Sequence, residues 1–329
     1  MKESVLVTGA NGFIGSHLSE ALVDAGFRVF AMVRKEESKN QRFNELVKNG
    51  DIILIKGDII NFDFDSIPKI DYIYSIAGRV SVWGKKQDFR KTNIGGNARL
   101  LELAAKRKVK CFTFLSSVAV YGFYGYQNLP EEGVKKPFKN QYSLTKLETE
   151  KLVEEKCNQA GIDYLIVRPG NVYGEYDYTS SYDIYTRIKN EKMLISANGK
   201  YQSCFVYVKN LADAIVHLST NKKYRNTDYN IADNNKTLKE VFTEIATEFN
   251  VKPKFKNFPA PMAKFVAGTV ENTYKLFRIK KTPLITRFTV YQNCADYSFS
   301  TKKLESTGYA RKYSDNQGIK NTVNWINSL

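Results

Sequence analysis

Cysteine and histidine are both scarce in this chain of 329 residues, which holds four cysteines and two histidines. The cysteines, at positions 111, 157, 204 and 294, are far apart and form no Cys-x-x-Cys pair. The sequence therefore indicates neither a disulfide scaffold nor a zinc site. His17 and His217 are too few and too scattered for a metal centre, and we expect His17 to be a packed helix residue. No metal is expected.

Long apolar runs are also absent. No segment approaches the ~20 apolar residues that a membrane-spanning helix needs. The first strand-like run begins three residues after Met1, so no signal peptide is expected. The sequence predicts a protein of the reducing cytoplasm.

Acidic residues are few relative to basic ones: 34 Asp and Glu face 50 Lys and Arg, which gives a net charge of +16. Such an excess suits nucleic acid, an anionic membrane surface or phosphorylated ligands. The basic residues are dispersed and no nucleic-acid motif is present, so we expect no nucleic-acid partner.

Strand-like and helix-like segments alternate along the chain. The strand-like runs are 4–8, 28–33, 52–55, 72–76, 111–115 and 164–167, and the helix-like stretches include 97–106 and 144–157. This alternation predicts a Rossmann-type, doubly wound parallel sheet of the α/β class. We expect residues 1–174 to form the cofactor-binding domain, with 205–235 returning to its sheet at Val206–Val208 and Tyr229–Ile231. Residues 175–204 and 236–329 are expected to form a smaller, mainly helical substrate domain.

A glycine-rich turn follows the first strand-like run. Gly9, Ala10, Asn11, Gly12, Phe13, Ile14 and Gly15 stand between this run and an apolar-periodic helix. This context is typical of a dinucleotide fingerprint. Gly9 permits the tight turn, Gly12 lets the backbone approach a pyrophosphate, and Gly15 allows close packing of helix on strand. The N–H groups at the start of the helix favour phosphates.

The end of the second strand indicates which nicotinamide cofactor binds. An acid there commonly holds the ribose 2′-hydroxyl of NAD, but this chain has Val33 followed by Arg34 and Lys35. A guanidinium pairs well with a 2′-phosphate, so the sequence predicts NADP, with NAD as the alternative. On that alternative the two basic residues form a solvated end of the loop.

Two further strand ends are expected at the cofactor. Asp58 and Ile59 follow the third strand, where they would lie beside the adenine. Ala77 and Gly78 follow the fourth, where small residues leave room for the cofactor.

Tyr142 and Lys146 are four positions apart and would share one helix face. A free phenol has a pKa near ~10. A cation about 4 Å away, at an effective dielectric constant near 20, contributes roughly 4 kcal/mol before screening. We therefore expect Lys146 to lower the pKa of Tyr142 and make it a general acid and base.

Five motifs in order along the chain resemble the extended short-chain dehydrogenase/reductase superfamily, whose members include NAD-dependent epimerases and dehydratases. They are Thr8–Gly15, Leu115–Gly122, Tyr142-x-x-x-Lys146, Arg168–Gly174 and Phe205–Val208. The resemblance spans essentially the whole chain. Thr282–Phe288, Phe299–Tyr309 and Tyr207–Asn210 are similar to segments of the 3β-hydroxysteroid dehydrogenase and dihydroflavonol reductase branch.

The resemblance implies a role for each matching residue. Tyr142 would be the catalytic acid and base, and Lys146 would also hold the nicotinamide ribose. Ser117 would hydrogen-bond the substrate oxygen, with its neighbour Ser116 as the alternative. Asn93 would belong to the catalytic group or shape its helix.

Two residues of the Arg168–Gly174 motif complete the set that the resemblance implies. Pro169 would border the nicotinamide. Arg168 would be structural.

The substrate is left open between three hypotheses. The first is interconversion of a ketone and a secondary alcohol on an apolar substrate such as a steroid, a triterpenoid or a 3-oxo lipid. The segment 258–281 would line its pocket or lie on a membrane with its basic end near lipid phosphates, or pack in the core.

The second hypothesis is a nucleotide-sugar epimerase, dehydratase or reductase, with which Asn171 is compatible. The sequence departs from that group where an arginine commonly holds the sugar diphosphate, because Gln202–Cys204 stands there. Lys200 or Arg287 would have to substitute.

The third hypothesis is a cofactor-sensing module without catalysis. It is disfavoured because such proteins usually lose the tyrosine or the lysine. A small-molecule substrate is expected in the first two cases. The resemblance also implies a homodimer, for which the sequence gives no independent sign.

Overall fold

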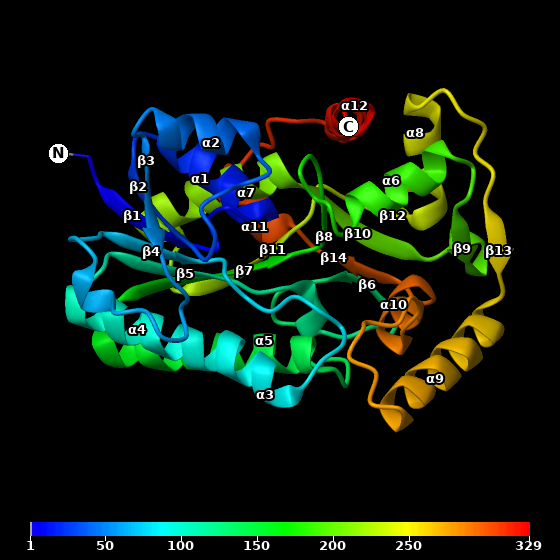
Figure 1. Cartoon of the computed structure of the whole chain (residues 1–329), viewed down its shortest axis with the longest axis horizontal. Helices are drawn as coiled ribbons and strands as arrows, with labels where there is room; N and C mark the ends of the chain where they lie inside the picture. The colour runs from blue at the N-terminus through cyan, green and yellow to red at the C-terminus, as the bar shows by residue number, and fades with distance from the viewer. Residues whose placement is uncertain (1) are drawn as a thin grey trace.

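A seven-stranded parallel sheet forms the centre of the computed structural model, which describes residues 2–329 (Figure 1). The strand order is β11-β7-β5-β4-β1-β2-β3. The bounds are β1 (Ser4–Thr8), β2 (Arg28–Val33), β3 (Ile52–Lys56), β4 (Tyr72–Ser75), β5 (Cys111–Leu115), β7 (Asp163–Pro169) and β11 (Thr227–Ile231). The order reverses between β1 and β4, as in dinucleotide-binding sheets. The α/β doubly wound fold expected from the sequence is confirmed.

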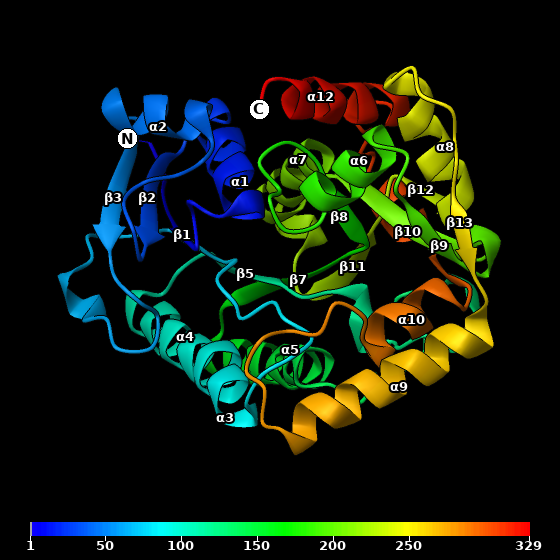
Figure 2. The same ribbon diagram turned by 45° about the vertical axis from the view of Figure 1, so that its right-hand side comes forward.

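Helices cover both faces of this sheet (Figure 2). One face carries α1 (Phe13–Asp24), α2 (Gln41–Lys48) and α7 (Val208–Thr220), and the other carries α3 (Lys86–Phe89), α4 (Gly96–Arg107) and α5 (Gln141–Ala160). The strands read as continuous apolar runs because both of their faces are buried.

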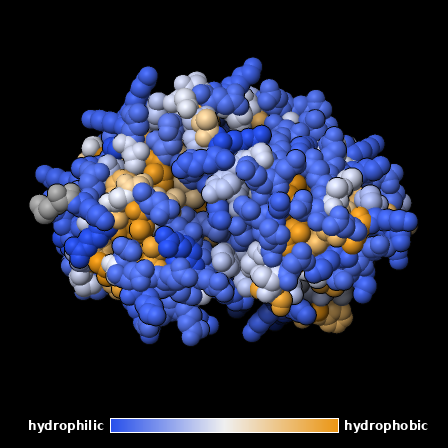
Figure 3. All heavy atoms as spheres, turned by 90° about the horizontal axis from the view of Figure 1, so that it is seen from above, coloured by the Kyte–Doolittle hydropathy of each residue, from blue (hydrophilic) through white to orange (hydrophobic). Residues whose placement is uncertain are grey.

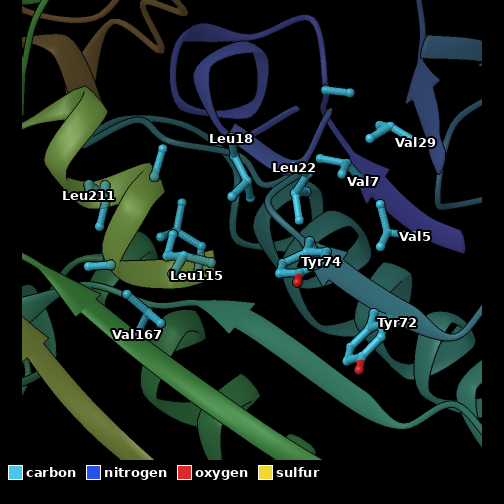
Figure 4. Packing of buried hydrophobic residues seen from close by; sticks show 14 of the residues in the cluster. Val5, Val7, Leu18, Leu22, Val29, Tyr72, Tyr74, Leu115, Val167 and Leu211 are labelled. Carbon is cyan, nitrogen blue, oxygen red and sulfur yellow. The ribbon is translucent and has the colours of Figure 1, made fainter. Parts of the chain in front are cut away.

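Two apolar cores lie on the two faces of the sheet. On the first face, Leu22 of α1 packs beside Val7 of β1, and Leu211 of α7 lies beside Leu115 and Val167 (Figure 4). On the second face, Leu100 and Leu103 of α4 and Val153 of α5 share a core with strand residues. The strand residues include Leu6 of β1 and Ile73 of β4. Each fully buried side chain of this size stabilises the fold by roughly 1.5–3 kcal/mol.

Helix α5 carries the tyrosine and the lysine of the sequence pattern. It begins where the side chain of Asn140 accepts a hydrogen bond from Ser143 N at 2.8 Å. It ends at Gly161, whose φ of 65° is left-handed. Tyr142 therefore lies in the first turn, and Lys146 follows one turn later.

A second group of strands and helices packs beside the sheet. Five strands form a sheet in the order β12-β10-β14-β6, with β8 paired to β10, and β9 pairs with β13. These strands are β6 (Tyr126–Leu129), β8 (Asn171–Tyr173), β9 (Leu194–Ser196), β10 (Gln202–Tyr207), β12 (Asn234–Thr237), β13 (Lys256–Phe258) and β14 (Tyr297–Phe299). The other helices are α6 (Ser181–Lys189), α8 (Leu238–Glu248), α9 (Ala260–Leu276), α10 (Arg287–Asn293), α11 (Lys302–Glu305) and α12 (Asp315–Asn327).

One expected return to the main sheet is wrong. Val206 and Tyr207 lie in β10, which pairs with β8, β12 and β14 of the smaller sheet, and Val208 begins α7. Only Tyr229–Ile231 returns, as part of β11 beside β7. The strand itself was recognisable, but its partners are distant in sequence and leave no local signal.

The molecular surface is mostly polar on the face seen from above in Figure 1. Hydrophilic residues dominate that face, and its apolar atoms form separate small patches (Figure 3). Within residues 2–329, no helix is both long enough and apolar enough to cross a membrane.

Candidate active site

A cavity of about 1540 Å³ runs along the carboxyl ends of the central strands. Its wall includes the glycine turn after β1, Arg34 after β2, Asp58 and Ile59 after β3, Ala77 and Gly78 after β4, Ser117 after β5 and Pro169 at the end of β7. Tyr142 and Lys146 also line it. Ligands of open α/β sheets bind at this edge, outside the strand ends where the order reverses.

The glycine turn is built too tightly for side chains. A Cβ atom on Gly15 would lie 2.2 Å from the carbonyl oxygen of Gly9, and Gly9 itself has a left-handed φ of 65°. Gly12 N donates to that same oxygen at 3.0 Å. None of the described side chains caps the start of α1, and its first two residues, Phe13 and Ile14, line the cavity. This cradle fits the pyrophosphate of a dinucleotide.

Asn11 ties this turn to the next loop. Its amide nitrogen donates to the carbonyl oxygens of Lys35 at 2.6 Å and Glu37 at 3.1 Å. Arg34 lines the cavity, whereas Lys35 does not. Of the two basic residues expected at the cofactor, the structure brings only Arg34 to the cavity.

Asp58 and Ile59 form another part of the wall. Asp58 Oδ1 accepts a hydrogen bond from Ile60 N at 3.0 Å, which fixes the turn after β3. Ile59 packs against Gly96 of α4, where a Cβ would lie 2.5 Å from Ile59 Cδ1. The turn hydrogen bond thus fixes Asp58, and packing on α4 fixes Ile59.

Ser117, Tyr142 and Lys146 meet in the middle of the cavity wall. The Ser117 hydroxyl lies close enough to the Tyr142 phenol to influence its pKa, and it accepts from Ala119 N at 3.2 Å. Ser116 points elsewhere, because its hydroxyl donates to Glu150 at 2.5 Å. The geometry therefore favours Ser117 over Ser116 as the hydroxyl available to a substrate.

Lys146 is buried and Tyr142 is half-buried, and burial acts on the pKa of both groups. It raises the pKa of Tyr142, and the nearby Ser117 hydroxyl partly opposes this shift. The direction is opposite to the one expected from the charge of Lys146. Burial also lowers the pKa of Lys146 to about 8, partly offset by Glu150. The Lys146 ammonium donates to the carbonyl oxygen of Leu115 at 2.5 Å.

Asn93 lies behind the wall rather than in it. Its side chain is 2 % exposed; its Oδ1 accepts from Arg79 N at 2.7 Å and its Nδ2 donates to Thr145 Oγ1 at 3.0 Å. It sits in a π-helical stretch, Arg90–Gly95. Asn93 thus links the loop after β4 to α5 and positions the residues on either side.

Arg168 belongs to a buried network beneath the cavity. Its guanidinium makes two hydrogen bonds to Glu150, at 2.8 and 2.9 Å, and one to Tyr121 Oη at 2.7 Å, and it also pairs with Asp228. No solvent reaches its side chain. Arg168 therefore has a structural role, because it joins β7 to α5.

The far half of the cavity contains a polar trio. Asn171 Nδ2 donates to Tyr297 Oη at 2.5 Å, and Gln292 Nε2 donates to both Asn171 Oδ1 and Tyr297 Oη at 2.8 Å. All three residues line the cavity. Gln292 and Tyr297 gave no signal in the sequence, since only the fold brings α10 and β14 beside Asn171.

The cations expected to hold a sugar diphosphate are not at the cavity. Lys200 and Arg287 do not line it, and Arg287 is held by Glu271 of α9. Arg79 and Arg187 do line it. Arg187 Nε donates to Asp183 at 2.8 Å, one turn earlier on α6. Arg79 could have been predicted from the sequence, because it directly follows Ala77–Gly78 at the end of β4. Arg187 lies in no recognisable motif and could not.

The rest of the far wall is apolar. It is formed mainly by α8, α9, α10 and the segment before α10, with Leu238, Val241, Phe242, Ile245, Phe258, Val266, Leu284, Ile285 and Phe288. The cavity thus joins a polar end suited to a dinucleotide to a chamber with a large apolar wall.

Comparison with known proteins identifies one family for most of the chain. A family model described as "NAD dependent epimerase/dehydratase family" matches residues 5–232. The chain is 25% identical to an N-acetyl-alpha-D-glucosaminyl-diphospho-ditrans,octacis-undecaprenol 4-epimerase of Escherichia coli O157:H7, over 99% of this chain and 96% of that protein. It is 23% identical to a 2-alkyl-3-oxoalkanoate reductase of Shewanella oneidensis, over 95% and 84% of the two chains.

Solved structures show the same fold. The UDP-glucuronic acid 4-epimerase of Bacillus cereus, in complex with UDP-glucuronic acid and NAD, superposes with a TM-score of 0.79. It is 22% identical in sequence, and 99% of each chain is covered. The comparisons do not distinguish the 3β-hydroxysteroid dehydrogenase branch from the others.

Proposed function

Because this chain belongs to the NAD dependent epimerase/dehydratase family, we propose that it is an enzyme that transforms a sugar carried on a diphosphate, by redox chemistry at a carbinol carbon. The observation that carries the proposal is the meeting of Ser117, Tyr142 and Lys146 in the wall of a cavity whose other end is the glycine cradle. Several relatives, including the undecaprenol-linked 4-epimerase, act on sugars of this kind.

The residues divide the proton chemistry between them. When bound, the nicotinamide accepts or supplies a hydride at the carbon of a carbon–oxygen bond. Tyr142 Oη, as the phenolate, takes the proton of the substrate hydroxyl and, as the phenol, returns it when the carbonyl is reduced again. Ser117 Oγ donates a hydrogen bond to the same oxygen, where negative charge develops. Lys146 keeps positive charge beside this oxygen and beside the cofactor.

The substrate half of the cavity supports a sugar diphosphate. Asn171, Gln292 and Tyr297 offer amide and hydroxyl groups of the kind that bind ring hydroxyls. Arg187 and Arg79 are cations within the cavity wall, and guanidinium groups pair well with phosphate oxygens. They would take the place of the arginine missing from Gln202–Cys204.

We propose NADP as the preferred cofactor. Arg34 lines the cavity directly after β2, and Val33 rather than an acid ends that strand. The family also supports NAD, which the Bacillus cereus epimerase contains. We also propose that residues 1–174, whose sheet β11 completes, bind the cofactor, and that 175–204 with 236–329 supply the substrate half.

A second candidate function is reduction of a ketone on an apolar substrate, such as a 3-oxo lipid, a steroid or a triterpenoid. The apolar wall of α8, α9 and α10 favours it, and so does the similarity to the 2-alkyl-3-oxoalkanoate reductase. The two candidates share the roles of Ser117 and Tyr142 and differ in substrate.

A substrate panel separates the two candidates. The purified protein is incubated with NADP(H) or NAD(H) and with UDP-hexoses, a polyprenyl-diphosphate-linked N-acetylhexosamine, a 3-oxoacyl ester or a hydroxysteroid. Epimerisation yields a new sugar, resolved by NMR, without net change in nicotinamide absorbance, whereas ketone reduction consumes the reduced cofactor stoichiometrically. We expect NMR to show a new sugar in the incubations with sugar diphosphates. Turnover of the oxo substrates alone would replace it with the second candidate.

A further inference from the structure

Exposed apolar side chains are concentrated on α9 and the segment that follows it. Among residues 2–329, 14 large apolar side chains are exposed, and six of them lie within 262–284. These six are Met262 (51 % exposed), Phe265 (75 %), Leu276 (77 %), Phe277 (69 %), Ile279 (37 %) and Leu284 (96 %). Concentration of this kind, unlike scattered single residues, marks an interaction surface. We call these six residues the α9 surface.

The inner face of α9 already has its packing partners. Ala263 and Ala267 are fully buried against Val290 of α10 and Cys294, which directly follows that helix. Met262, Phe265 and Leu276 project from the opposite side of the helix, three and eleven residues apart. The apolar residues on that side therefore add nothing to the core, and they cost solubility if they face only water.

The exposure of Phe277 is not the result of a frayed helix end. Arg278 adopts a left-handed φ of 52°, and Ile279 N donates back to Tyr274 O at 2.9 Å, which closes the helix. Trp83 Nε1 donates to Ile279 O at 3.1 Å, and its ring packs edge-on against Tyr274. The backbone thus presents Leu276 and Phe277 outward in a fixed conformation.

Basic side chains surround the α9 surface. They are Lys264, Lys275, Arg278, Lys280 and Lys281, all of them exposed. The acid of α9, Glu271, hydrogen-bonds the backbone of Arg287 and pairs with its guanidinium. Within 262–284 the exposed charged residues are therefore all basic, and they stand beside six exposed apolar side chains.

We propose that the α9 surface docks on an anionic lipid bilayer. Apolar side chains enter the boundary between headgroups and acyl chains, while lysine and arginine reach lipid phosphates. Each basic residue near such a surface adds to the attraction, and Trp83 and Tyr274 are of the type that prefers the membrane interface. An anionic bilayer meets both sets of side chains at once, because its phosphates lie above its acyl chains.

The α9 surface also adjoins the cavity. Leu284 belongs to both, and Val266 and Ile285, from the same segments, line the cavity. A protein docked through this surface would open its apolar chamber toward the bilayer. The docking does not depend on the proposed function; if both hold, the carrier of the sugar diphosphate is a membrane lipid.

Vesicle co-sedimentation tests the docking. The full chain is mixed with vesicles of phosphatidylcholine alone or of phosphatidylcholine with phosphatidylglycerol, at low and at high salt. We expect binding to the anionic vesicles, weakened by salt, and at least tenfold weaker binding to the neutral ones. Absence of binding to the anionic vesicles overturns the proposal.

Matched variants distinguish docking from general charge attraction. Lys275→Glu, Arg278→Glu and Lys280→Glu together change the net charge by the same amount as Lys48→Glu, Lys69→Glu and Lys151→Glu, which are exposed residues of other helices and loops. The first triple should weaken partitioning more than tenfold and the second less than threefold. Equal loss in both triples contradicts a defined docking surface.

Apolar variants give a second, independent readout. Phe277→Ser should weaken partitioning severalfold, whereas Val134→Ser, at a residue 73 % exposed elsewhere, should leave it unchanged. Thermal unfolding of each variant establishes that it is folded. Concentration-dependent self-association that Phe277→Ser abolishes, without vesicle binding, would make the surface a protein interface and overturn the proposal.

Discussion

Lys146 Nζ lies 6.0 Å from the centre of the Tyr142 ring, and it donates to the carbonyl oxygen of Leu115 at 2.5 Å. The two residues share a face of α5, yet the ammonium is held on the end of β5. Burial disfavours charge on both: it raises the pKa of the phenol and lowers the pKa of the ammonium to about 8.

The lowered pKa of Lys146 predicts a pH dependence of stability. In the unfolded chain the amine titrates near its ordinary value of 10.5, whereas in the folded protein it titrates near 8. Between these values the unfolded state binds more protons, so this group makes the folded state more stable as pH rises from about 8 to 10.5. Below pH 8 the buried charge opposes folding by up to about 3 kcal/mol.

Lys146→Met should remove this effect. The gain in stability of the variant over the wild type, measured by urea unfolding, should be largest below pH 8 and should shrink as pH rises toward 10. A difference that does not vary with pH would show that the folded-state pKa of Lys146 is ordinary.

Gly15→Ala should disrupt the cofactor cradle. Its Cβ would lie 2.2 Å from the carbonyl oxygen of Gly9, so the turn must shift. We expect a loss of about 1–3 kcal/mol in stability and a large loss of dinucleotide affinity, measured by urea unfolding and fluorescence titration. Gly95→Ala is the control: its Cβ would approach only Arg90 O, at 3.8 Å, and should be neutral or stabilise by roughly 0.5–1 kcal/mol.

The two adjacent serines should separate catalysis from stability. Ser117→Ala removes a donor to the substrate oxygen and should lower kcat/KM by roughly 10²–10³. Ser116→Ala instead removes a hydrogen bond to buried Glu150, which should cost about 1–3 kcal/mol of stability and leave kcat nearly unchanged. Steady-state kinetics and urea unfolding check both variants; an unaltered kcat/KM for Ser117→Ala contradicts the assignment.

Arg34 should select the cofactor. If its guanidinium pairs with the 2′-phosphate, Arg34→Ala loses about 1.5–3 kcal/mol of NADP affinity, roughly tenfold to a hundredfold, with little change for NAD. Lys35→Ala, at a residue outside the cavity wall, should change neither. Isothermal titration of the wild type and both variants with each cofactor measures these six affinities, and tighter binding of NAD by the wild type rejects the choice of NADP.

Local sequence patterns were enough to predict the glycine turn after β1 and the catalytic pair on α5. The turn Gly9–Gly15 and the spacing of Tyr142 and Lys146 are set by neighbours in sequence, so the sequence could place them. Gln292 and Tyr297 could not be predicted, because they reach Asn171 only through the packing of α10 and β14.

The direction of the Tyr142 pKa shift also depended on distant residues. Helical spacing gave the phenol and the ammonium a common face, but burial by the surrounding elements decides the shift. The strand at Val206 was recognisable from its composition, whereas its place in the smaller sheet depends on pairing with β8, β12 and β14.

The most direct test of the account is Tyr142→Phe, compared with the wild type on a substrate identified by the panel. The phenyl ring keeps the packing but cannot hold a proton at the former hydroxyl. We predict that product formation falls by at least roughly a hundredfold while the dissociation constant for the dinucleotide stays within about twofold, less than 0.5 kcal/mol. A variant that binds the cofactor and turns over at the wild-type rate would contradict the central role of Tyr142.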